Sequence, residues 1–159
     1  MALASALVWE VRTSGADTNG GGFKTGASGT DRSQQDGAFA TLSVLSTVHT
    51  TTTQINVSLV DYTVVAGDVG NVLQVTGGSA TAGFYEITAV DVPNNRWTMD
   101  RSVGTAAQTV IGVMGGALAT LTILIDVSVA NNWIYVKSGT YTHATAPRFH
   151  GGVVVRRRE

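Results

Sequence analysis

The sequence predicts a mainly β protein in which a small antiparallel barrel or sandwich is inserted into a second, strand-based part. Residues 54–59 alternate polar and apolar side chains, which is typical of a strand with one buried face. Further runs are rich in β-branched and aromatic residues, and glycine, proline and asparagine separate them at intervals of about ten residues. Regular short strands with turns between them are typical of a small barrel or sandwich.

The first predicted strand contains Trp9, which we expect to anchor a core, and a turn at residues 17–22 follows it. Asp17 and Asn19 begin like a calcium-binding loop, because closely spaced oxygens can face one hard cation. The last liganding position of such a loop falls on Ser28 instead of the glutamate that it requires. The three glycines of the segment lack the Lys-Ser/Thr pair of a phosphate-binding loop. We therefore predict a turn and no metal site.

The predicted barrel or sandwich covers residues 44–113, and a polar, glycine- and serine-rich loop is expected before it at 26–35. Its strands are expected at 54–59, 71–76, 84–90 and 96–100. Residues 1–43 and 114–159 together form the second part. The expected organisation is one domain that carries an inserted one.

Residues 116–130 fit two structures. One face of a helix would hold Leu118, Leu121, Ile125 and Val129. Alternate positions of the same segment are also apolar, as in a strand, and its β-branched content favours the strand. Helix and strand both stay open here. A clear strand is predicted at 133–137, with a turn at 138–140 after it.

Composition limits the classes of function. Charged residues make up 13% of the chain, about half of the roughly 25% usual in soluble proteins, and the net charge is −1. No general positive field is available to attract nucleic acid or an anionic membrane, so neither is an expected partner. The absence of cysteine excludes disulfides and thiolate metal sites. We identify no signal peptide and no membrane span, and expect a soluble protein made without secretion.

No pattern typical of a catalytic or cofactor site is present. His49, His143 and His150 lack zinc-ligand spacing, and no serine lies in a nucleophile elbow. The acidic residues are scattered singly beside turns, as at Asp68 and Asp91, which favours solvated turns or caps over paired catalytic carboxylates. Six aromatic side chains could stack on sugars but are predicted to pack in the core: Trp9, Phe84, Tyr85, Trp97, Trp133 and Tyr135. We predict no enzyme, no cofactor and no metal.

Two stretches resemble the start of a known fold. Residues 8–20 (VWEVRTSGADTNG) resemble the opening strand and turn of right-handed parallel β-helix proteins of the pectin-lyase-like class, and residues 133–141 (WIYVKSGTY) resemble their next strand. In such proteins an amphipathic helix between these strands caps the open end of the solenoid, and residues 118–129 stand in its place. The wider pattern is similar to the N-terminal region of β-helix proteins of tailed phages, through DVGNVLQVTGG at 68–78, GFYEI at 83–87 and MDRS at 99–102.

The resemblance implies a virion surface protein and identifies no catalytic residue. Residues 142–159 amount to less than one further coil of about 20 to 25 residues, so we expect a truncated β-helix-like start without the solenoid and its enzymatic groove. An open strand edge would remain, which a partner must cover. The expected partner contacts are Val153, Val154, Val155, Arg156, Arg157 and Arg158.

We therefore expect a non-enzymatic structural protein on the surface of a bacteriophage virion, made in the host cytoplasm, with capsid decoration (cement) as the first choice. The expected partners are copies of the same chain, in a trimer or a head-to-tail assembly, and the major capsid protein. One alternative is the head or receptor-binding module of a tail fibre or tailspike, which would bind a host glycan. The other is a subunit that polymerises into a filament by adding strands at its β edge.

Overall fold

The computed structural model describes residue 3, residues 6–141 and residues 152–158. It is mainly β with one short α-helix, as the sequence predicts. The strands are β1 Leu7–Val11, β2 Gly22–Lys24, β3 Ala40–Leu42, β4 Thr47–Val48, β5 Gln54–Asn56, β6 Val72–Gly78, β7 Gly83–Asp91, β8 Arg96–Met99, β9 Val110–Met114, β10 Trp133–Lys137 and β11 Val154–Arg158. The helices are the 3-10 turn η1 Ala66–Asp68 and α1 Thr122–Val127.

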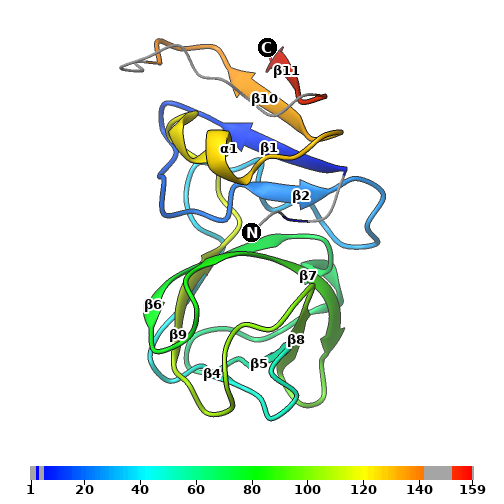
Figure 1. Ribbon diagram of the computed structural model, residues 1–159, viewed down its shortest axis with the longest axis vertical. Helices are drawn as coiled ribbons and strands as arrows, with labels where there is room; N and C mark the ends of the chain where they lie inside the picture. Colours follow the sequence, from blue (N-terminus) through cyan, green and yellow to red (C-terminus); the bar gives the residue numbers. More distant parts are fainter. Residues whose placement is uncertain (1–2, 4–5, 142–151, 159) are drawn as a thin grey trace.

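The larger sheet is antiparallel and curls into a barrel-like shape, with strand order β3-β9-β6-β7-β8-β5-β4 (Figure 1). Its pairing shifts register between Val75 and Gly77 and again between Ile87 and Ala89. Bulges of this kind bend a strand and increase its twist, so they help the sheet to curl.

The curl brings the end strand β4 against the segment that leads into β9. The backbone N–H of Val48 donates to the carbonyl of Gln108 at 2.8 Å, and the N–H of Ala107 donates to the carbonyl of Val48 at 2.9 Å. The N–H of Val110 donates to the carbonyl of Ser46 at 2.8 Å. These bonds satisfy the backbone groups that the end of an open sheet would expose.

A buried carboxylate lies inside the barrel core. Asp68 is fully buried and accepts hydrogen bonds from Trp97 Nε1 at 2.9 Å, from the Tyr62 hydroxyl at 2.8 Å and from the Val65 N–H at 3.1 Å. Of the two alternatives predicted for this residue, a solvated turn is wrong because Asp68 is buried, whereas a cap is confirmed because its carboxylate accepts the N–H of Val65, the N-cap residue of η1. Burial, together with the hydrogen bond to Asp68, raises the pKa of Tyr62 well above its usual value.

The smaller sheet has the order β11-β10-β1-β2. Strands β1, β10 and β11 are mutually parallel, whereas β2 is antiparallel to β1. The register aligns Trp9 with Ile134, and Ile134 with Val155. Every residue of β11 pairs with the residue 21 positions before it in β10, as in the pair Trp133 and Val154.

Helix α1 belongs to the hydrophobic core of the smaller sheet. Leu124 is fully buried together with Trp9, Leu118 and Ile134, and Figure 1 shows the helix beside β1. The helix ends at Val127, where the next residue takes up an extended conformation. The ambiguity over residues 116–130 is thus resolved as six helical residues flanked by non-helical backbone.

The two sheets pack against each other through several contacts. The Trp9 and Phe84 rings meet edge to face at 5.7 Å, and Lys24 Nζ lies 2.9 Å from the buried carboxylate of Glu86. Beside β1, the Leu118 N–H donates to the Glu10 carbonyl, and the Leu118 carbonyl accepts from the Arg12 N–H, both at 2.9 Å. The chain therefore leaves the smaller sheet after β2, forms the barrel, and comes back at Leu118 to a position beside β1.

The strands predicted at 71–76, 84–90, 96–100 and 133–137 correspond to β6, β7, β8 and β10, whereas only the first half of 54–59 is strand, as β5. The three-residue strand β3 lies before residue 44 and pairs with β9 in the larger sheet. The division at residues 43/44 and 113/114 stays a prediction. Among the described residues, no helix is long and apolar enough to cross a membrane.

Candidate functional site

The candidate site is the outer side of β11, which we call the β11 edge. β11 is the last strand of the smaller sheet and lies at the end of the molecule farthest from the barrel (Figure 1). At the opposite end of this sheet, β2 is covered: Phe23 bridges to Asn71, and the Lys24 N–H donates to the Gly70 carbonyl at 2.8 Å. Within the described residues, no strand pairs with the outer side of β11.

The direction of the backbone groups of β11 follows from its register. The Val154 N–H donates to the Asn132 carbonyl of the neighbouring chain segment at 3.0 Å. Because alternate residues of a parallel strand bond to the same neighbour, Val154 and Arg156 direct their N–H and C=O groups toward β10. Val155 and Arg157 therefore direct theirs outward, where a further strand can bind.

The apolar side of the ladder is incompletely covered at this end. Trp9 and Ile134 are fully buried, but Val155, which is aligned with them, is 47% exposed. Val154 on the opposite face is 39% exposed. β11 therefore presents half-exposed apolar side chains on both faces, in addition to its outward backbone groups.

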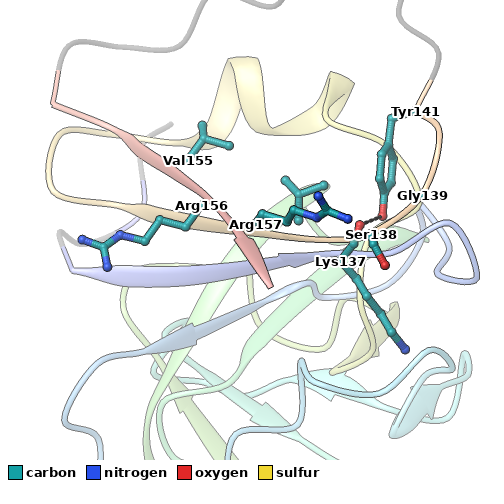
Figure 2. Close-up of a pocket in the computed structure, with 8 residues that line it drawn as sticks. Lys137, Ser138, Gly139, Tyr141, Val155, Arg156 and Arg157 are labelled. Atoms are coloured by element: carbon teal, nitrogen blue, oxygen red, sulfur yellow. Dashed lines mark hydrogen bonds between the residues drawn. The ribbon is translucent and has the colours of Figure 1, made fainter. Parts of the chain in front are cut away.

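Positive charge surrounds these apolar side chains. The Arg156 guanidinium lies over the Trp133 ring, 4.2 Å from its centre. Figure 2 shows the Arg156 and Arg157 side chains leaving β11 in opposite directions. Both residues are exposed, so the edge carries cations on both of its faces.

A pocket of about 480 Å³ opens beside this edge (Figure 2). It is lined by the turn 137–139, by Tyr141 and by Val155, Arg156 and Arg157. The Tyr141 hydroxyl donates to the Lys137 carbonyl at 2.8 Å, which holds the turn closed. The lining carries lysine and arginine and no acidic side chain, so the pocket suits an anionic group.

Of the contact residues predicted from the sequence, Val154, Val155, Arg156 and Arg157 lie on this edge, and Val153 packs partly buried against the core of the smaller sheet. Arg158 is the last residue of β11, and its side chain lies outside the described part of the chain. Their role as partner contacts stays a prediction.

The turn at 17–22 has an internal function. The Asp17 carboxylate accepts hydrogen bonds from the N–H groups of Ala119 and Thr120, at 3.0 and 2.8 Å, and from the Thr120 hydroxyl at 2.8 Å. Asn19 Nδ2 donates to the Ala117 carbonyl at 2.9 Å. The polar side chains that begin like a calcium loop thus fix the segment before α1.

The residues considered for chemistry are dispersed. His49 lies in a turn with Thr51, and His143 and His150 lie outside the described residues. Among the described residues, no group of three or more histidine, cysteine or acidic side chains could hold a metal ion. Four of the six aromatic side chains lie in the core, as predicted: Trp9, Phe84, Tyr85 and Trp97. Trp133 and Tyr135 are only partly buried, with ring centres 6.3 Å apart.

The sequence reasoning missed one apolar surface. Val44, Leu45, Leu59 and Val60 are 57 to 82% exposed on two adjacent turns. Asp61 joins these turns, because its carboxylate accepts from the Ser43 N–H at 2.9 Å and the Ser46 hydroxyl at 2.7 Å. The sequence did contain a signal for this surface, because each apolar pair is flanked by serine or aspartate, and serine and aspartate favour exposed turns.

Searches against protein-family models, curated proteins and solved structures gave no match to this chain.

Proposed function

We propose that the protein is a non-enzymatic structural protein of a tailed-phage virion, and that it is the head or receptor-binding module of a tail fibre or tailspike, built on a capped, truncated β-solenoid start. The observation that carries the proposal is the ladder of β1, β10 and β11, three parallel strands with aligned inward side chains. Parallel strands joined by coils of uniform length are typical of solenoids, and the 21-residue spacing between β10 and β11 is of that size.

Two further features support the proposal. Helix α1 and Leu118 cover the apolar side of β1 and β10, as a terminal cap must in a repeat architecture. Among the described residues, no three histidine, cysteine or acidic side chains lie together so that they could hold a metal ion, which is in keeping with a structural role.

Capsid decoration, the first choice from the sequence, rests on the low charge of the chain and on the exposed apolar turns at Val44 and Leu59. We rank capsid decoration second because this role does not explain why β1, β10 and β11 form a parallel ladder. A glycan-binding role for the tail module would use the partly exposed pair Trp133 and Tyr135, because the other four of the six aromatic side chains considered for sugar stacking are buried.

The test is to locate the protein in particles of the phage that encodes it. Gold-labelled antibodies and quantitative mass spectrometry of purified particles should place a few copies per virion at the tail. Hundreds of copies over the head, together with capture of the pure protein by emptied capsids, would replace the tail role by decoration. Absence from the particles would reject both.

A further inference from the structure

We infer that the β11 edge is a docking site for an extended, acidic segment of a different protein, which adds to the smaller sheet as a fifth strand. The inference concerns the chemistry of this edge and does not depend on which part of the virion contains the protein. Three independent features carry it: outward backbone groups with which no strand of the described residues pairs, an incompletely covered apolar ladder and exposed positive charge.

The backbone provides the affinity. Val155 and Arg157 direct their N–H and C=O groups away from β10, in the alternation fixed by the bond from Val154 to Asn132. A strand that binds there satisfies these groups and covers Val155, which is 47% exposed although its aligned partner Ile134 is buried. Strand addition of this type gains affinity from main-chain bonds and specificity from side-chain positions.

The side chains specify the partner. On one face an incoming strand meets Val155 and then Arg157, and on the other it meets Val154 and then Arg156. Opposite charges on neighbouring strands stabilise a pair and like charges destabilise it. The partner strand therefore needs an apolar residue beside Val155 and acidic residues beside Arg156 and Arg157. The adjacent cationic pocket at Lys137 and Arg157 can hold a further carboxylate.

A second copy of the chain fits this site poorly. Pairing two β11 strands in parallel register places arginine beside arginine, and an antiparallel pairing centred on Val155 sets the arginines opposite valine and glycine, so that none of the six arginines has an acidic residue of 152–158 opposite it. A head-to-tail pairing needs another free edge, but β2 is bridged to Asn71 and β4 is bonded to the segment before β9. The short strand β3 offers only three residues. The described surface thus favours a heterologous partner.

The probe is a synthetic peptide as long as β11, with a valine followed by two glutamates at the positions that pair with residues 155–157. A matched peptide carries two lysines in place of the glutamates. We expect the glutamate peptide to bind at low ionic strength at least about tenfold more tightly than the lysine peptide, and to weaken as salt screens the arginines. The amide signals of Val155 and Arg157 should shift in NMR spectra.

Two variants locate the site on the full chain. Val155→Pro removes an outward donor and should abolish binding, whereas Val155→Thr keeps the donor and should bind the glutamate peptide within about threefold of the unmodified protein. If the proline variant does not fold by circular dichroism, Arg157→Glu serves instead, and it should remove the preference for the glutamate peptide.

Equal affinity for both peptides, or no binding of either, overturns the inference. A dimer of the pure protein that Val155→Pro dissolves also overturns it, because the edge would then belong to a second copy. Absence of the protein from phage particles, with peptide binding intact, would reject the virion role and leave the docking site standing.

Discussion

Ile134 and Val155 are aligned neighbours on parallel strands, yet Ile134 is fully buried and Val155 is 47% exposed. The two residues hold equivalent positions on the neighbouring strands β10 and β11. They differ in whether a further strand lies beside them. Ile134 has β1 on one side and β11 on the other, whereas in the described part of the chain Val155 has a neighbouring strand on one side only.

This difference predicts unequal costs of truncation. Ile134→Ala should lower the free energy of unfolding by about 2 to 5 kcal/mol, because it leaves a cavity in the core. Val155→Ala should cost less than about 1 kcal/mol, because water already reaches the side chain. Urea denaturation measures both changes. Equal losses would mean that Val155 is already covered in solution.

Asp17 should stabilise the protein without any metal. Asp17→Ala removes three hydrogen bonds to Ala119 and Thr120 and should cost about 1 to 3 kcal/mol of unfolding free energy. Asp91→Ala is the matched control, because the hydrogen bonds of this acid to described residues go to Asn94 within its own exposed turn, and it should cost less. Calcium or a chelator should leave Tm unchanged; a rise in Tm with calcium would contradict a role of Asp17 that depends only on its bonds to Ala119 and Thr120.

Gly20 should not tolerate a side chain. A Cβ at this position would lie 2.0 Å from the carbonyl oxygen of Val72 and 3.0 Å from the backbone nitrogen of Gly115, neither of which is flexible. Gly20→Ala should therefore cost at least about 1 to 3 kcal/mol through overpacking. Gly37→Ala meets nothing within 4 Å and should change stability by less than about 0.5 kcal/mol. Thermal unfolding of the two variants compares them directly.

Alkaline pH should destabilise the barrel through Tyr62. Burial and the Asp68 hydrogen bond raise the pKa of Tyr62 above its usual value of 10.0, so the folded state keeps a proton that the unfolded chain loses. The contribution of Tyr62 to the free energy of unfolding is complete below pH 10.0 and falls as the pH rises above 10.0. Stability curves measured on both sides of this pH should be steeper for the natural protein than for Tyr62→Phe.

The same comparison has a built-in check. Burial also raises the pKa of Tyr85, so some alkaline loss should persist in the Tyr62→Phe variant. Identical curves for the two proteins would mean that Tyr62 ionises in the folded state as readily as in the unfolded chain. Ultraviolet difference spectra follow the phenolate directly.

The longer strands could be predicted because their periodicity is local. β6, β7, β8 and β10 each contain a run of β-branched or aromatic residues bounded by turn residues. β2, β3 and β4 contain only two or three residues, too few for a pattern to emerge. Their positions depend on partners far away in the sequence, such as Met114 for Ala40.

The helix and the candidate site show a second limit. Residues 122–127 carry helix and strand signals of similar strength, and the Asp17 bonds to Ala119 and Thr120, more than 100 residues away, fix the segment before the helix. At the β11 edge, the valines and arginines are evident in the sequence. Which of them direct their backbone groups outward depends on the register with β10.

The return of the chain to β1 has a consequence for how the protein could be altered. The segment between Glu10 and Leu118 begins and ends at two residues that are joined by a backbone hydrogen bond. The number of residues in this segment therefore does not change how β1, β10 and β11 pair. The barrel can therefore be exchanged for another module with equally close ends, provided that β2, the Asp17 turn and the contacts of Val72 and Phe84 with the core of the smaller sheet are kept. New surface properties can then be gained while the scaffold that carries them is inherited unchanged.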